Sequence, residues 1–283
     1  MGHKVRKRLF PVLSLLYLLI IFGAPSSASL LLLTTQTTVW HRLLAGAAAG
    51  PAFAVLCAAT AGLFSLPHRK GIVPGSFPRS LSHPVYFHRR MYGLCWTSLY
   101  YCKPVYHFCL CVPWLKALVF RLFGYRGDLN FTVYPDTWIR DLPLLDFGKG
   151  AYISNRATLG TNIVLSNGRI LVDRIVLKEG SLVGHLAMLA PGVRLGAGAE
   201  IAVGCGIGIR AAIGDGAWVG PMSTVEHGVT IGSRARVGIR SYIGSRARVG
   251  ERVVLQPGAF ISARAVVEAP SSPTEEERLS CAL

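Results

Sequence analysis

Two histidines, His185 and His227, stand in the carboxy-terminal half of the sequence among small and aliphatic residues. A neutral imidazole accepts a proton near neutral pH, so each is a candidate general base for a hydroxyl or amine nucleophile. Arginines gather soon after the second histidine, and guanidinium groups grip phosphate oxygens through paired hydrogen bonds. The arginines concerned are Arg234, Arg236, Arg246, Arg248 and Arg252. Whether a histidine and these arginines lie close together depends on the repeat in which they stand.

A repeat of six residues runs through this half of the chain. The octet IGSRARVG occupies residues 231–238 and returns unchanged at 243–250, a shift of twelve. Every sixth position from 153 to 267 is Ile, Leu or Val, and the residue two places earlier is mostly Ala, Ser or Cys. The aliphatic positions are Ile153, Leu159, Leu165, Leu171, Leu177, Val183, Leu189, Leu195, Ile201, Ile207, Ile213, Val219, Val225, Ile231, Val237, Ile243, Val249, Leu255, Ile261 and Val267.

This period predicts an all-β parallel β-helix, because six residues turn an α-helix by about 600° and leave no constant face. Each hexad is one short strand and one turn, and three hexads close a triangular coil of roughly 18 residues. We expect six to seven coils within residues 131–267, with the aliphatic side chain inside and the arginines outside. His185 and His227 are seven hexads apart. Seven is not a multiple of three, so we expect them on different parts of the coil.

The repeat, with its I-G-x-x-A/S-x-V/I style, resembles the left-handed β-helix of the hexapeptide-repeat acyltransferase superfamily. That resemblance implies the left hand, a homotrimer and an active-site groove between two subunits. His185 with Ala190-Pro191-Gly192-Val193 is similar to the G-H…P-G-V arrangement of sugar acetyltransferases, one residue earlier in the hexad. It implies a catalytic His185, with His227 as second choice, acyl-CoA as co-substrate, and the five arginines on the CoA phosphates.

Members of that superfamily often interrupt the repeat with a long loop, whereas the six-residue period here is unbroken. We therefore expect residues 70–146 to build the site, or catalysis to have been lost. The segments at 141–160 and 183–199 also resemble the membrane-bound terminal module of polylysine-synthetase-type nonribosomal peptide synthetases.

The amino-terminal part, residues 1–75, predicts an α-helical membrane hairpin. A basic cluster at 4–8 precedes an apolar run at 9–24, and a second uncharged run covers 43–66. Positive residues flank both outer ends, which favours two spans with both ends and the β-helix in the cytoplasm at the inner or plasma membrane. The alternative for residues 9–33 is a cleaved signal peptide.

Residues 76–130 are aromatic and basic, and predict helices beside the membrane. The part at 94–123 either spans the bilayer or lies in its interface with aromatic rings at headgroup depth. We predict the second arrangement. Residues 268–283 predict a disordered acidic tail.

The net charge of +16, from thirty Lys and Arg against fourteen Asp and Glu, suits an anionic partner such as membrane lipid. No nucleic-acid motif is present, so we expect no nucleic-acid partner. A metal site of the carbonic anhydrase type needs three histidines, and two on separate faces do not supply them, so we expect no metal. The sequence favours a membrane-tethered enzyme that moves an acyl group from a CoA or carrier-protein thioester to a hydroxyl or amine. Its acceptor would be a cell-envelope, lipid-linked or secondary-metabolite substrate. The alternative is a non-catalytic β-helix scaffold or terminal module of a peptide synthetase or transport assembly.

Overall fold

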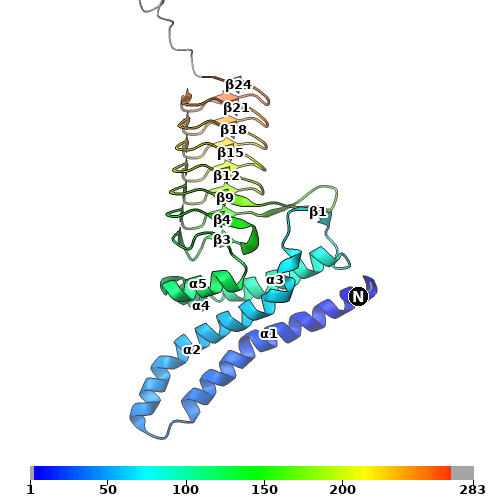
Figure 1. Cartoon of the computed structure of the whole chain (residues 1–283), viewed down its shortest axis with the longest axis vertical. Helices are drawn as coiled ribbons and strands as arrows, with labels where there is room; N and C mark the ends of the chain where they lie inside the picture. The colour runs from blue at the N-terminus through cyan, green and yellow to red at the C-terminus, as the bar shows by residue number, and fades with distance from the viewer. Residues whose placement is uncertain (1–2, 269–283) are drawn as a thin grey trace, which may run out of the picture.

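The computed structural model describes residues 3–268, which form a helical end and a β-helix (Figure 1). The predicted acidic tail lies, apart from Glu268, outside the described residues.

Three parallel sheets of seven short strands each enclose the β-helix within the described residues. We call these sheets faces 1, 2 and 3 in the order in which the chain visits them. Face 1 holds β2 (Thr132–Val133), β5 (Tyr152–Ile153), β10 (Leu182–Val183), β13 (Glu200–Ile201), β16 (Trp218–Val219), β19 (Arg236–Val237) and β22 (Val254–Leu255). Face 2 holds β3 (Trp138–Ile139), β6 (Thr158–Leu159), β11 (Met188–Leu189), β14 (Gly206–Ile207), β17 (Thr224–Val225), β20 (Tyr242–Ile243) and β23 (Phe260–Ile261). Face 3 holds β4 (Leu145–Phe147), β9 (Ile175–Leu177), β12 (Arg194–Leu195), β15 (Ala212–Ile213), β18 (Thr230–Ile231), β21 (Arg248–Val249) and β24 (Val266–Val267).

Each coil stacks on the one before with a shift of eighteen residues, as the pairing of Ile201 with Val219 shows. The second residue of each strand points inward, and Ile201 and Val219 are fully buried. The small residue two places earlier, such as Ala217, is buried beside it. Backbone bonds join successive coils, for example Trp218 N–H to the Ala235 carbonyl at 2.9 Å. The predicted parallel β-helix, with its coil number, is thus confirmed.

The prediction of an unbroken repeat is wrong at one place. Phe147 pairs with Leu177 on face 3, thirty residues on instead of eighteen. The twelve additional residues form a hairpin of β7 (Asn162–Val164) and β8 (Arg169–Val172) that leaves the prism, so Leu165 and Leu171 are not part of its faces. Twelve residues are two hexads, so the excursion keeps the aliphatic residues in phase and counting by six does not reveal it.

The hairpin connects the prism to the helical end. Strand β1 (Gly75–Pro78) pairs antiparallel with β8, and Arg169 Nε donates to Ser76 Oγ at 3.0 Å. Figure 1 shows this three-stranded sheet reaching out from the lower coils toward the helices. The repeat is therefore interrupted by a loop after all, and that loop serves the junction.

Helices α1 (His3–Thr34) and α2 (Val39–Ser65) form a helical hairpin that ends in the 3-10 helix η1 (Leu66–Gly71). Both are long and apolar enough to cross a membrane, and large side chains such as Leu19 and Leu44 are more than half exposed. A third span would exist among the described residues only if α4 (Lys103–Cys111) and α5 (Pro113–Leu122), bent by 115°, formed one segment.

Helices α3 (Pro84–Tyr101), α4 (Lys103–Cys111) and α5 (Pro113–Leu122) lie between that pair and the first coils (Figure 1). Most of their aromatic side chains are buried inside the protein, which differs from the expected position at headgroup depth. Trp96 Nε1 donates to the Ile139 carbonyl at 2.7 Å, and Tyr92 OH donates to the Phe123 carbonyl at 2.8 Å. Burial of a Trp or Tyr ring is favourable when its N–H or O–H group also finds a hydrogen-bond acceptor, as it does here. The aromatic segment thus closes the bottom of the β-helix.

Candidate functional site

The five predicted phosphate-binding arginines lie on the upper coils, and four of them border face 3. Arg248 projects from face 3 itself. Arg234 and Arg252 occupy the corner between faces 3 and 1, and Arg246 the corner between faces 2 and 3. Arg252 N–H donates to the Ser233 carbonyl at 2.9 Å, which places Arg252 one coil above Arg234. Arg236 projects from face 1.

The corner arginines have the left-handed backbone conformation, which costs free energy for any residue other than glycine. Their φ angles are 57° at Arg234, 60° at Arg246 and 56° at Arg252. In the lower coils of the corner between faces 3 and 1, glycine fills the same position, at Gly150, Gly180, Gly198 and Gly216. A left-handed residue with a side chain costs roughly 1–3 kcal/mol. The same conformation recurs at other corner arginines, Arg156, Arg210, Arg240 and Arg264.

His227 lies at the corner between faces 2 and 3, beside a shallow hollow of about 270 Å³ on face 2. The Ile209 N–H donates to its Nδ1 at 3.0 Å. A neutral imidazole with an acceptor at Nδ1 carries its proton on Nε2, so this ring offers a donor to the hollow.

His185 lies at the corner between faces 1 and 2 and is half-buried. The Leu186 N–H donates to the Asn155 carbonyl at 3.4 Å, so Asn155 lies one coil below His185. The imidazole has no side-chain hydrogen bond within residues 3–268, so neither ring nitrogen is committed to a protein partner there. The corner around it is an exposed apolar ridge, formed by Leu186, Met188, Val203, Met222 and Ile239.

The two histidines therefore occupy different corners, as their spacing predicts. His227 shares its corner with Arg246, whereas His185 lies at the corner opposite the arginine-bordered face 3. A site that uses both His185 and these arginines needs face 3 of a second copy of the chain.

A run of hollows leads down face 3 to the helical end. The upper hollow, about 460 Å³, is lined by Arg194, Asp215 and Ser233, and shares Lys178 with a second of about 350 Å³. Asp146 lines this second hollow and also a pocket of about 550 Å³.

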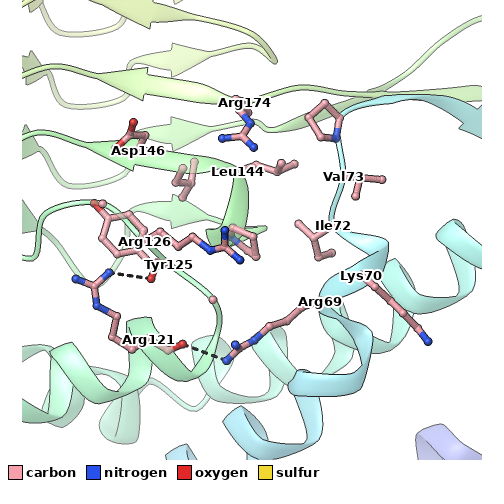
Figure 2. A pocket seen from close by; sticks show the side chains of 15 residues that line it. Arg69, Lys70, Ile72, Val73, Arg121, Tyr125, Arg126, Leu144, Asp146 and Arg174 are labelled. Atoms are coloured by element: carbon pink, nitrogen blue, oxygen red, sulfur yellow. Dashed lines mark hydrogen bonds between the residues drawn. The ribbon is translucent and has the colours of Figure 1, made fainter.

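This pocket, the junction pocket, lies where η1, the end of α5 and the first face 3 strands meet (Figure 2). Its cations are Arg69, Lys70, Arg121, Arg126 and Arg174, and its carboxylate is Asp146. Tyr125 forms part of the wall. Burial raises the pKa of Tyr125, whose hydroxyl donates to the Asp128 carbonyl at 2.8 Å, so the phenol adds no negative charge. The segment predicted to build a site, residues 70–146, includes three of these cations, Lys70, Arg121 and Arg126, but not Arg69 and Arg174.

A buried charge network holds the junction together. Arg89 on α3 and Asp141 before the first face 3 strand are 1% and 0% exposed, and form an ion pair. Thr161 Oγ1 donates to Asp141 at 2.5 Å, and Arg89 donates to Asn162 Oδ1 at 2.9 Å. Burial lowers the pKa of Arg89, and Asp141 opposes that shift. The helices, the first coil and the hairpin therefore share one desolvated contact.

No protein-family model matches the sequence, and comparison with curated proteins finds no similar sequence. Comparison with solved structures finds likenesses to several acyltransferases. One is perosamine N-acetyltransferase from Caulobacter crescentus, solved with CoA and GDP-perosamine, with 15% identity, 55% of this chain and 61% of that chain covered, and a TM-score of 0.21.

A second likeness is UDP-N-acetylglucosamine O-acyltransferase from Moraxella catarrhalis, with 12% identity, 51% and 65% covered, and a TM-score of 0.28. A third is the acetyltransferase domain of PglB from Neisseria gonorrhoeae, solved with acetyl coenzyme A, with 20% identity, 54% and 62% covered, and a TM-score of 0.19. The chain thus spans less than two thirds of the length of each of these three structures. At these scores the assignment of a function rests on the chain's own residues.

Proposed function

We propose that this protein is a membrane-tethered acyltransferase that uses a CoA or carrier-protein thioester. The observation that supports this most is the pairing of a six-residue-repeat β-helix with His185, an accessible imidazole on an apolar corner. The arginines around face 3 supply the phosphate-binding surface that a CoA donor requires.

In the proposed reaction His185 takes the proton from an acceptor hydroxyl or amine as that group attacks the thioester carbonyl. A new ester or amide bond forms, the carbon–sulfur bond breaks, and the thiolate leaves. The imidazolium then returns its proton to the thiolate, which balances the reaction and restores the neutral base.

The distance between His185 and the arginine-bordered face within one prism favours a site shared between subunits. The exposed apolar ridge beside His185 is the surface that a second copy would cover, since exposed apolar patches of this kind mark interaction sites. We therefore propose a homotrimer with one site in each groove between prisms. The helical hairpin would hold the trimer at the inner or plasma membrane, with the β-helix in the cytoplasm.

The test is acyl transfer by the full chain in lipid nanodiscs, with a panel of acyl-CoAs and release of free thiol as the readout. His185→Ala should reduce the rate at least 100-fold while the oligomer remains intact, and His227→Ala should act as the matched control. Unchanged thiol release in His185→Ala would contradict the site assignment.

A shared site makes a second prediction that a site within one chain does not make. Co-expression of His185→Ala with Arg234→Glu/Arg252→Glu should give mixed oligomers in which some grooves combine two intact halves. Activity should then reappear, although each variant alone is inactive. Absence of recovery in mixed oligomers would place the whole site within one chain.

The non-catalytic scaffold is the second candidate, and one observation favours it. General-base histidines are commonly oriented by a hydrogen bond that the ring N–H donates to a second group, and His185 has no such side-chain partner among residues 3–268. If no acyl-CoA in the panel is consumed while the oligomer is intact, the scaffold is the better description.

A further inference from the structure

The junction pocket gathers positive charge that the protein itself does not neutralise. Within residues 3–268 none of its five cations forms an ion pair with a carboxylate. The Nε of Arg69 is also buried without a hydrogen-bond partner. Charges of one sign repel each other, and a buried donor without a partner is costly, so both features favour a bound anion.

The acidic residues near the pocket do not neutralise its five cations. Asp173 precedes Arg174 in the chain, yet its carboxylate pairs with Arg210 at 2.9 Å. Asp141 is enclosed by Arg89 and Arg140. Asp146 lines the pocket, but forms no ion pair with any of the five cations. The pocket is therefore left with one carboxylate against five cations.

The pocket also lies at the end of a candidate membrane span. Arg69 and Lys70 belong to η1, which continues α2 directly, and Figure 2 shows both beneath the loop that leads to β1. Arg69 donates to the Arg121 carbonyl at 3.1 Å, so η1 and the end of α5 are tied together there. A ligand in this pocket would sit beside the headgroup region if α2 crosses the bilayer.

The size of the pocket and its continuation give the ligand's class. About 550 Å³ exceeds the needs of a lone phosphate and lies in the range of pockets for small organic ligands. Asp146 is common to this pocket and to the run of hollows on face 3, so a headgroup held here would extend toward the arginines of the upper coils.

We propose that the junction pocket binds the phosphate group of a membrane lipid headgroup and presents that headgroup to face 3. The binding claim stands on the pocket alone. The presentation of the lipid as acyl acceptor rests on the proposed function.

Arg126 and Arg174 are the residues to change, because both are exposed and neither side chain forms a hydrogen bond in residues 3–268. The probe is dioctanoyl phosphatidic acid, titrated against the full chain in detergent by microscale thermophoresis. Arg126→Glu/Arg174→Glu should weaken binding at least 10-fold. Arg156→Glu/Arg264→Glu, which changes the charge equally at exposed corners of the β-helix, should stay within twofold of the wild type.

Two further arms identify the source of the phosphate. Glycerol 3-phosphate should bind at least 10-fold more weakly than the lipid; equal affinity would overturn the lipid in favour of a soluble phosphorylated ligand. Dioctanoylglycerol, which has the same acyl chains and no phosphate, should bind weakly too, and equal affinity would show that the acyl chains alone are recognised. Equal binding by the pocket variant and the wild type would overturn the proposal outright.

The outcome for the proposed function is separable. His185→Ala should bind dioctanoyl phosphatidic acid like the wild type. Lipid binding that depends on Arg126 and Arg174, in a protein that consumes no acyl-CoA, would keep this site and reject the acyltransferase. Acyl transfer that is unaffected by the pocket variant would reject the role of the site in presenting the acceptor.

Discussion

The two basic regions of this protein are built in opposite ways. On the upper coils the arginines recur through the repeat, as Arg234 and Arg252 do one coil apart. They project from turns and strands of the β-helix that need no other part of the fold. In the junction pocket the cations come from η1, from α5 and the loop after it, and from the end of the hairpin. A repeat makes a charged surface by stacking, whereas the pocket exists only when distant segments are packed together.

This difference implies different sensitivity to mutation. A corner arginine on a solvent-exposed turn can be lost without disturbing its neighbours, because each coil contacts only the coils beside it. The junction depends on a desolvated network whose members have no substitute. Removal of a single buried partner should therefore affect the lower region far more than the upper one.

The largest effect is expected for Asp141→Ala. It leaves the Arg89 guanidinium buried without its counter-ion, which costs about 3–5 kcal/mol. Arg252→Ala on the top corner should cost less than about 1 kcal/mol. Both are measured by urea unfolding in detergent, followed by tryptophan fluorescence, because Trp96 lies in the junction.

The double variant Arg89→Met/Asp141→Leu is the informative control for that experiment. Replacement of a buried ion pair by apolar residues of similar volume is often close to neutral. Recovery of most of the lost stability would show that the unpaired charge is responsible. A double variant as unstable as Asp141→Ala would show that lost side-chain packing, and not the unpaired charge, is responsible.

A smaller effect is expected when the hairpin is removed. Deletion of residues 162–173 joins Thr161 to Arg174, whose neighbour Asp173 already donates to the Thr161 carbonyl at 3.0 Å. The deletion returns face 3 to an eighteen-residue coil, so the β-helix should still fold, as judged by its far-UV circular dichroism. Loss of the buried Ile170 and Val172 side chains should cost about 3 kcal/mol. Deletion of eleven residues, which breaks the phase, is the matched control and should abolish folding of the first coils.

The same hairpin shows how far the sequence can be interpreted. The inward positions, such as Ile201 and Ala217, and the separate corners of His185 and His227 follow from the period alone, because each hexad is fixed by its own core. The hairpin stayed hidden because an insertion of two hexads has the same phase as the repeat. The junction pocket stayed hidden because Arg69, Arg126 and Arg174 have no sequence relation to one another, and only tertiary packing brings them to one pocket.

Substitution of the corner arginines by glycine tests their role in CoA binding better than substitution by alanine, because glycine tolerates the left-handed conformation. Arg234→Gly/Arg252→Gly restores at one corner the residue type found in the lower coils. Relief of the left-handed conformation, about 1–3 kcal/mol per residue, opposes the entropic cost of glycine, about 0.5–1 kcal/mol. The thermal midpoint should therefore stay equal or rise by a few degrees, while affinity for CoA, measured by calorimetry, falls at least 10-fold. Unchanged CoA affinity would make these arginines a solvated surface.

The smallest effect is a pH dependence confined to the lower region. Burial lowers the pKa of His88 below its ordinary value, and the positive charges of Lys70 and Arg6 act in the same direction. Its Nδ1 lies 2.9 Å from Nδ1 of His68, so one of the two nitrogens must act as an acceptor. Because the unfolded chain then binds the proton more readily, stability should fall as the pH drops below about 6.5. His88 is only half-buried, so its own part of the loss between pH 7.5 and 5.5 should stay below about 1 kcal/mol. His88→Gln should reduce this slope in urea unfolding at the two pH values, while the neighbouring His68 keeps its own part of it. An undiminished slope in that variant would assign the whole effect to another group.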